Sequence, residues 1–443
     1  MNSIASKNNL TLDNEAWRIA YHAIVEQYQS GQMPTAFDKA LRATEKFPFS
    51  PDLWKLLGSI SQELNRGEVT IAAFRQAVAL SGDDPANHSN LAIALHGQGR
   101  MAEAILSLQR VTELDPSDAD AHYNLGVLLR ESGQVKEAIA AYRRALNLNP
   151  EVAEAFNNLG ILLCEQGRLG EGIDAYKLAL SVQPNYWEAL LNLGTELQKV
   201  HFASADRSLY PCLEQLLNAA SMVSPADVAP AILSLLKHDP VLVDILGEPS
   251  GQLDLETHLN LISKLEQLPL LQKLMRLCPL PDLELERIFT GIRSVLLEHV
   301  SALVDTPFLE SFQSTLSLQC FLNEHVYFET ERDSENVAGL KRLIERNLAA
   351  GKEPEVAEVL CLSLFRPLHR FHWSEDLSSL KKLPEVRERL IAQPLGEQRL
   401  AREIRTLGPI SNDVSIKVKR QYEENPYPRW AQLGVSQSKL PID

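Results

Sequence analysis

Two histidines near the C-terminal end of the chain have the spacing of a helical metal-ligand pair. His369 and His372 are three residues apart and lie beside Phe371 and Trp373. A zinc-type site needs a third ligand, and a catalytic site needs a nearby carboxylate, but the surrounding sequence supplies neither at a useful spacing. We therefore expect no metal site here and interpret this segment as an aromatic packing corner.

The cysteines are the second candidate for chemistry. The five of them are far apart, with no pair at the two-residue spacing of zinc or redox sites: Cys164, Cys212, Cys278, Cys320 and Cys361. Cys320 would need a neighbouring base to act as a nucleophile, so core packing is the better interpretation. We assign no catalytic residue, and the cysteines are expected to be reduced, as in a cytoplasmic protein.

One column of polar residues favours binding rather than catalysis. Asparagine recurs every 34 residues at Asn90, Asn124, Asn158 and Asn192. Asparagine is a mediocre residue inside a helix, but its amide can both donate to and accept from one peptide unit of an extended chain. A row of such amides would hold a peptide backbone whatever its sequence. The alternative is that asparagine only caps or spaces the repeats.

Acidic and small residues accompany this column. The acidic ones lie one helical turn before an asparagine: Asp120, Glu154 and Glu188. They predict an acidic groove that favours a basic or polar extended peptide. The small ones are expected to leave room for such a ligand: Ala121, Ala155 and Ala189.

The elements that would position these residues follow from a 34-residue repeat. Four columns show the period: Pro48, Pro116, Pro150 and Pro184; Gly58, Gly126, Gly160 and Gly194; Ala36, Ala104 and Ala138; Ala43, Ala77, Ala145 and Ala179. Apolar spacing predicts two helices per unit. A glycine suited to positive φ separates them, at Gly31, Gly99, Gly133 and Gly167. Gly126 is expected to pack on Ala138, and Tyr142 beside Ala145.

This column set resembles the tetratricopeptide repeat family, with units starting near Trp17, Pro51, Pro85, Ala119 and Ala153 and a half-formed sixth from Trp187. The resemblance implies an α-solenoid that binds protein or peptide. The asparagine column is similar to the ladder in the repeat domain of O-linked N-acetylglucosamine transferases. The chain shows no donor-binding domain for a sugar transferase, so only the ladder is carried over.

The charge of the chain argues against several partner classes. Its 443 residues carry a formal net charge of -15 with a pI of about 5.3. That field repels phosphate backbones and anionic lipid surfaces, so neither nucleic acid nor a membrane is an expected partner. The first 13 residues lack the apolar run of a secretory signal, and no apolar stretch is long enough to cross a bilayer. We expect a cytoplasmic protein.

The second half of the chain loses the repeat but keeps helical spacing. Helices are predicted over Leu255–Leu268, Leu283–Val300, Val337–Ala350 and Glu353–Phe365, with no strand pattern of convincing length. The predicted fold is all-α. It comprises an N-terminal tail (1–16), the repeat array (17–200), an irregular helical domain (201–411) and an extended C-terminal arm (412–443).

Two segments of this half carry a second resemblance. They run from Gln319 to Tyr327 (QCFLNEHVY) and from Val418 to Trp430 (VKRQYEENPYPRW). Together with the repeats, they look like the non-catalytic N-terminal part of bacterial tetratricopeptide proteins that carry a class I S-adenosylmethionine-dependent methyltransferase domain. The resemblance implies that a methyltransferase domain follows the second segment. Only 13 residues follow Trp430 here, too few for its cofactor-binding strand and glycine-rich turn.

The second segment has physics of its own. Its prolines impose an extended path, and its aromatic and arginine residues are of the types that dominate interfaces: Tyr422, Asn425, Pro426, Tyr427, Pro428, Arg429 and Trp430. It is expected to dock as an arm, either on a catalytic domain or on its own helical domain.

Two functional interpretations follow. The first is a scaffold that captures an extended partner chain, with no cofactor of its own and no enzymatic activity. The alternative is the substrate-recruiting portion of a methyltransferase whose catalytic domain, and with it S-adenosylmethionine, is supplied elsewhere.

Overall fold

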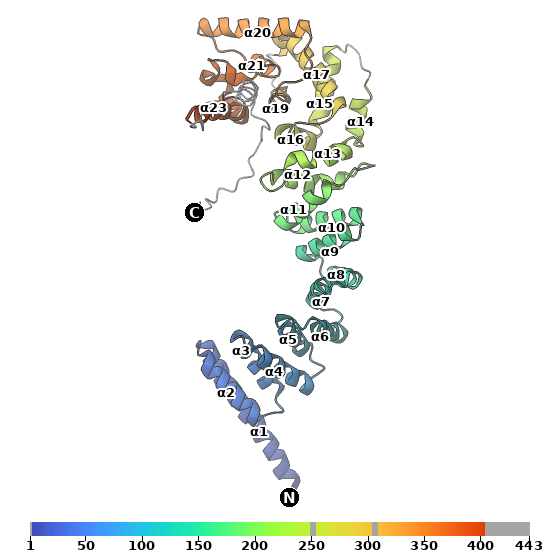
Figure 1. Cartoon of the computed structure of the whole chain (residues 1–443), viewed down its shortest axis with the longest axis vertical. Helices are drawn as coiled ribbons and strands as arrows, with labels where there is room; N and C mark the ends of the chain where they lie inside the picture. Colours follow the sequence, from blue (N-terminus) through green and yellow to red (C-terminus); the bar gives the residue numbers. More distant parts are fainter. Residues whose placement is uncertain (1, 249–253, 304–308, 404–443) are drawn as a thin grey trace, which may run out of the picture. The chain divides into compact units, whose positions relative to one another are not determined.

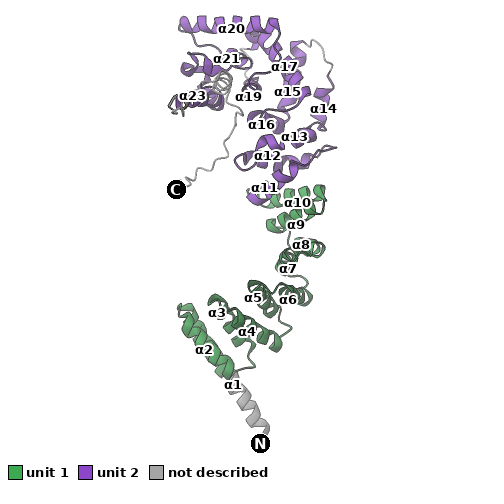
Figure 2. Ribbon diagram, viewed as in Figure 1, with its two compact units in different colours: residues 1–186 green, residues 187–443 purple. Residues whose placement is uncertain are grey.

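The computed structural model describes residues 2–248, 254–303 and 309–403, and their side chains from residue 16 to residue 400. Within these ranges the secondary structure is helical, with no strand. Contacts divide the chain into two compact units, Met1–Tyr186 and Trp187–Asp443 (Figure 2). The predicted all-α fold is confirmed. The expected arm, including Tyr422 to Trp430, lies outside the described residues.

Unit 1 is a row of antiparallel helix pairs, five in the described residues (Figure 1). The pairs are α1 (Asn2–Gln29) with α2 (Met33–Lys46), α3 (Pro51–Glu63) with α4 (Gly67–Leu80), α5 (Pro85–Gly97) with α6 (Met101–Leu114), α7 (Ala119–Glu131) with α8 (Val135–Leu148), and α9 (Ala153–Glu165) with α10 (Leu169–Val182). The first helix starts at Asn2 rather than near Trp17, since no proline or glycine interrupts the sequence before Gly31. The expected tail is therefore helical from Asn2 onward.

The turn inside each pair has one residue in the left-handed region. Glycine occupies four of these turns, with φ between 71° and 78°: Gly31, Gly99, Gly133 and Gly167. The second pair has Asn65 at the equivalent place, with φ 55°. Asparagine is among the few other residues that adopt this conformation readily, so the turn is kept where the glycine column appears to break.

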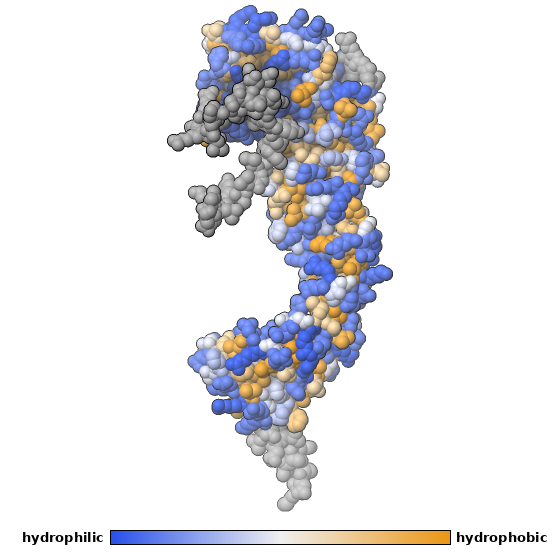
Figure 3. Space-filling view, in the orientation of Figure 1, coloured by the Kyte–Doolittle hydropathy of each residue, from blue (hydrophilic) through white to orange (hydrophobic). Residues whose placement is uncertain are grey.

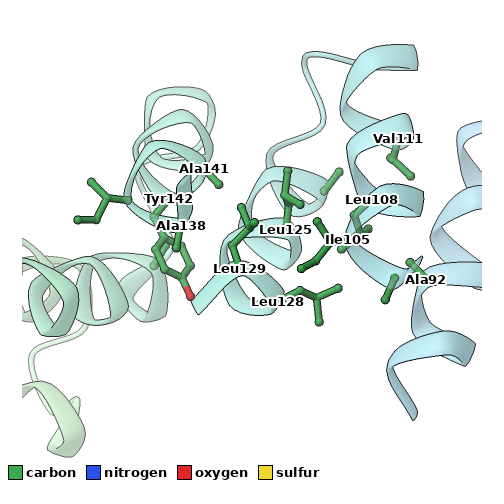
Figure 4. Packing of buried hydrophobic residues seen from close by; sticks show 14 of the residues in the cluster. Ala92, Ile105, Leu108, Val111, Leu125, Leu128, Leu129, Ala138, Ala141 and Tyr142 are labelled. Carbon is green, nitrogen blue, oxygen red and sulfur yellow. The ribbon is translucent and has the colours of Figure 1, made fainter. Parts of the chain in front are cut away.

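The two helices of a pair are closest where a glycine meets an aromatic ring. A Cβ atom on Gly126 would lie 2.8 Å from the ring of Tyr142. Gly58 faces Phe74 and Gly160 faces Tyr176 in the same way, at 2.5 and 2.7 Å. The expectation that Gly126 faces Ala138 was therefore incomplete, because the Tyr142 ring occupies the space above the glycine. Figure 4 shows Tyr142 packed in the cluster with Ala138 and Leu129.

The third pair departs from this pattern on both sides of the contact. Ala92 stands at the glycine position and Leu108 at the aromatic position, and both are buried. A larger residue on one helix is thus matched by a smaller one on the other. This matching keeps the packed volume nearly constant, which is what a close-packed core requires.

A ring nitrogen joins each of three first helices to the turn before it. Trp54 Nε1 donates to the carbonyl oxygen of Pro48 at 2.9 Å, and His88 Nε2 lies 3.0 Å from that of Gly82. His122 Nε2 lies 3.2 Å from the carbonyl oxygen of Pro116. The three rings are 34 residues apart, so the contact belongs to the repeat and fixes where each first helix begins.

Unit 2 contains irregular helices joined by proline-bearing turns. Its α-helices are α11 (Trp187–Leu197), α12 (Tyr210–Asn218), α13 (Pro225–Leu236), α14 (Pro240–Leu246), α15 (Leu255–Glu266), α16 (Pro269–Leu277), α17 (Leu283–Glu298), α18 (Val300–Leu303), α19 (Leu309–Leu322), α20 (Glu331–Ala349), α21 (Val356–Ser363), α22 (Pro384–Arg387) and α23 (Gln393–Glu403). Short 3-10 turns cover Arg207–Leu209, Leu368–Arg370, Ser374–Asp376 and Ser379–Lys382, and a π turn covers Glu388–Ala392. The four predicted helices of this half are present as α15, α17, α20 and α21.

The helix that organises unit 2 was not predicted. Except for two residues near its start, α19 is buried all round, and it packs on α16 and α21. A helix that is apolar on every side has no amphipathic period to detect.

A buried carboxylate fixes the first helices of unit 2. Asp239 has no exposed side-chain surface and accepts from Arg207 Nε at 2.8 Å and Nη2 at 2.7 Å, and from the Tyr210 hydroxyl at 2.7 Å. It also caps α14 through the backbone N–H of Val241. Burial opposes its ionisation, but these hydrogen bonds outweigh burial and lower the pKa of Asp239.

The glycine contact can be tested by mutation. Gly126→Ala would gain about 1 kcal/mol in helix propensity, but overpacking against Tyr142 costs about 1–3 kcal/mol. We expect a net loss of stability, and a loss smaller than the sum of the single changes when Gly126→Ala is combined with Tyr142→Leu, which copies the Ala92–Leu108 pair. Denaturant unfolding of the four proteins in the cycle measures the coupling.

A matched control is Gly170→Ala, since no atom lies within 4 Å of a Cβ atom built there. It should be neutral or stabilising. Strict additivity of Gly126→Ala and Tyr142→Leu would contradict the role given to this contact.

Candidate functional site

The first helices of unit 1 are adjacent to one another along the array. Arg130 of α7 donates from Nη1 to Asn158 Oδ1 of α9 at 2.8 Å, and His96 of α5 lies 2.7 Å from Glu131 of α7. The second helices are joined separately, through ion pairs such as Arg143–Glu171 at 3.1 Å. One face of unit 1 is therefore built by successive first helices alone.

The asparagine column lies on this face in three consecutive pairs. We call Asn90, Asn124 and Asn158 the amide row. Asn124 is exposed, and the other two are half-buried. Among the described residues, Asn90 and Asn124 have no side-chain hydrogen-bond partner, whereas the oxygen of Asn158 accepts from Arg130. Asn192 belongs to α11 in unit 2, so the continuous row has three members.

The acidic residues expected beside the row are in place on α7 and α9. Asp120 and Glu154 are exposed, and neither forms an ion pair with any described residue. Glu188 is half-buried on α11 in unit 2. The carboxylates of Asp120 and Glu154 are available to a cationic ligand.

The alanines expected to leave room for a ligand are not on this face. Ala121, Ala155 and Ala189 have 3%, 0% and 0% of their surface exposed. The first two belong to the core cluster of unit 1. They lie on the opposite side of the stripe from the acidic residues, where a small side chain lets neighbouring helices pack. The ligand-space interpretation of these alanines was wrong.

A second row on the same face was missed in the sequence. A β-branched aliphatic residue follows each asparagine by three positions, one helical turn on: Ile93, Val127 and Ile161, called the aliphatic row. Ile93 is 55% exposed, and the other two are partly exposed. Its 34-residue recurrence was visible in the sequence, but an apolar residue at helical spacing was taken as core.

Two phenols next to Arg130 are neutral. Burial raises the pKa of Tyr142 to about 12, and burial also raises the pKa of Tyr123, whose ring centroid lies 5.9 Å from that of Tyr142. The amide row therefore stands in a setting where hydrogen bonding and exposed carboxylates, rather than acid–base groups, face a ligand. Figure 3 shows hydrophilic and hydrophobic side chains interspersed over the visible surface of unit 1.

The QCFLNEHVY segment forms core structure in unit 2. Gln319 is fully buried, and its amide, with nitrogen toward the carbonyl oxygens of Met275 and Cys278, accepts from the Leu280 N–H at 3.1 Å. Cys320 is fully buried, and burial raises the pKa of its thiol to about 12. The thiol is therefore protonated at neutral pH, as core packing predicts.

The last residue of this segment covers a buried cation. Arg293, which is 1% exposed, has its guanidinium carbon 5.1 Å from the ring centroid of Tyr327 and 4.2 Å from that of Phe365. Cation–π contacts of this kind stabilise a guanidinium that is removed from water. Tyr327 thus joins the segment to α17.

The histidine pair lies in an aromatic corner. His369 is buried with its ring 6.1 Å from that of Phe321 and nearly perpendicular to it, while Phe371 stacks on Trp373 at 4.9 Å. His372 is exposed. In the part of the chain that the structure describes, no three His, Cys, Asp or Glu side chains gather as metal ligands, and no helix is long and apolar enough to cross a membrane.

Comparison with known proteins agrees with this architecture. Residues 61–119, 89–152 and 123–189 match the model of the tetratricopeptide repeat family, so these helix pairs are tetratricopeptide repeats. The search of curated proteins gave no match.

Among solved structures, MamA is 21% identical over 37% of this chain and 95% of its own, with a TM-score of 0.35. YrrB, described as a repeat protein with an unusual peptide-binding site, is 19% identical over 39% of this chain and 88% of its own, with a TM-score of 0.36. PilF of Pseudomonas aeruginosa is 17% identical over 49% and 96%, with a TM-score of 0.38.

Thiol labelling tests the assignment of the cysteines. Burial raises the pKa of Cys278, Cys320 and Cys361 to about 12, whereas Cys164 is only half-buried. Because the thiolate is the reactive form, iodoacetamide at pH 8 should alkylate Cys164 first and the other three only after unfolding. Peptide mass spectrometry reads out each site. Alkylation of native Cys320 as fast as Cys164 would refute the packing role.

Proposed function

We propose that unit 1 binds an extended segment of another protein across its first-helix face. The observation that carries the proposal is the amide row, in which Asn90 and Asn124 present side-chain amides without a partner in the described structure. An amide can pair with both the N–H and the C=O of one peptide unit. The binding would therefore be tolerant of sequence along the held backbone.

The charge of the face selects among such segments. Asp120 and Glu154 are exposed, and neither is paired with a described residue, and the chain as a whole carries a net charge of -15. Electrostatic complementarity speeds association with a basic segment and opposes an acidic one. The partner we propose is a basic or polar stretch of protein, not nucleic acid.

The amide row can be tested with peptides selected from a phage-displayed library on the wild-type chain. Each neutral hydrogen bond contributes about 0.5–1.5 kcal/mol. Asn90→Ala with Asn124→Ala should therefore weaken the selected peptides by about tenfold to a hundredfold. Asn158→Ala should have a smaller effect, since Arg130 already occupies its oxygen. Fluorescence anisotropy measures the affinities.

Asn147→Ala serves as the control, because Asn147 is an exposed asparagine on the second helix α8. It should leave affinity unchanged. The proposal fails if the selected peptides bind the Asn90, Asn124 double variant as tightly as the wild type while the variant remains folded.

We further propose that unit 2 presents the captured partner to an S-adenosylmethionine-dependent methyltransferase domain. One observation favours a covering partner at the QCFLNEHVY segment. Val326 and Phe328 are 69% and 70% exposed on either side of the buried Tyr327. The turn before them holds Glu324 and His325 at positive φ, 53° and 58°. Non-glycine residues in this region cost energy and gather at functional sites.

This second proposal makes a prediction for the chain alone. A class I methyltransferase holds its cofactor at the carboxyl ends of parallel strands, and the described residues contain no strand. Titration of this chain with S-adenosylmethionine should therefore release no binding heat in a calorimeter. Saturable heat at micromolar concentrations would show that the chain binds the cofactor itself.

A further inference from the structure

The amide row and the aliphatic row have the same period and run side by side. In α5, α7 and α9, each asparagine is followed one helical turn later by Ile93, Val127 or Ile161. A ligand that follows the amide row across successive first helices therefore passes an aliphatic side chain once per repeat. Ile93, at 55% exposed, and its half-buried neighbours retain surface to receive an apolar group.

The spacing of the helices sets the length of ligand between two such contacts. Adjacent packed helices lie about 8–10 Å apart. A polyproline II chain advances about 3.1 Å per residue, so three residues cover about 9.3 Å. Polyproline II also has three residues per turn, so every third side chain points to the same side.

A β-strand ligand does not satisfy both conditions. Its rise of about 3.3 Å per residue fits the helix spacing, but successive side chains alternate between faces. Residues three apart would then point to opposite sides, and only alternate repeats would receive an apolar side chain. The backbone of polyproline II, moreover, makes no internal hydrogen bonds, which leaves its N–H and C=O groups available to Asn90 and Asn124.

We infer that the segment bound by unit 1 is a polyproline II stretch with an apolar residue at every third position and basic residues between. The apolar residues contact the aliphatic row, the backbone pairs with the amide row, and the basic residues meet Asp120 and Glu154. This inference rests on the proposed function and adds to it the conformation and sequence period of the partner.

The test uses the full chain and two fluorescein-labelled peptides of identical composition. One consists of four Leu-Pro-Lys triplets, and in the other the same residues are ordered so that no two leucines are three apart. Because the peptides carry the same charge, general electrostatic attraction cancels between them. The triplet peptide should bind at least about tenfold more tightly, the cost expected when apolar side chains lose burial.

Two variants assign the preference to the aliphatic row. Ile93→Ser with Val127→Ser should bring the two peptides to nearly equal affinity. Leu106→Ser is the matched control, because Leu106 is 64% exposed on the second helix α6, and it should keep the preference.

The outcomes separate this inference from the proposed function. Equal affinity of the two peptides for the wild type, or binding of neither, overturns the three-residue period. The proposed function stands in either case if library-selected peptides still depend on Asn90 and Asn124. Loss of the preference in Leu106→Ser as well would also overturn the assignment to the aliphatic row.

Discussion

The array depends on how closely the two helices of each pair approach. At Gly126 there is no space for even one methyl group, since a Cβ atom would lie 2.8 Å from the Tyr142 ring. This contact fixes the angle of the pair, and the pair fixes which side of the first helix is left outside the core. Asn124 and Val127 face outward because Leu125, Gly126 and Leu129 face the second helix. A binding face is therefore a consequence of the packing rule, repeated once per pair.

Unit 2 is held together by buried polar groups rather than by a repeated contact. Gln319 ties α19 to the backbone after α16, Asp239 joins Arg207 and Tyr210 to α14, and Arg293 lies between two aromatic rings. Each of these groups is satisfied by partners from distant parts of the sequence. Such networks specify one arrangement of irregular helices, since a partner in the wrong place leaves a buried polar group unpaired.

The sequence predicted what is periodic and missed what is not. The helix pairs and their glycine turns follow from columns 34 residues apart, and the structure confirms them. The Asn65 turn was missed because asparagine replaces glycine there. The buried helix α19 was missed because it has no polar side. The contact of Gly126 with Tyr142 joins residues 16 positions apart, and no single column shows it.

The candidate site divides in the same way. The amide row was found from its period, but the sequence could not show that Arg130 occupies Asn158, because that bond depends on where a long side chain reaches. The alanines near the row were misplaced, since facing outward and facing inward differ by little more than one residue on a helix. The aliphatic row was overlooked because Ile93 has the residue type of a core position, and only its exposure reveals otherwise.

The central claim is that the side-chain amides of the first helices hold the backbone of a partner chain. The most direct measurement is the NMR spectrum of the asparagine side-chain amides during titration with a library-selected peptide. The account predicts that the signals of Asn90 and Asn124 move with saturation while that of Asn147 stays in place. Saturable peptide binding that leaves Asn90 and Asn124 unmoved would contradict it.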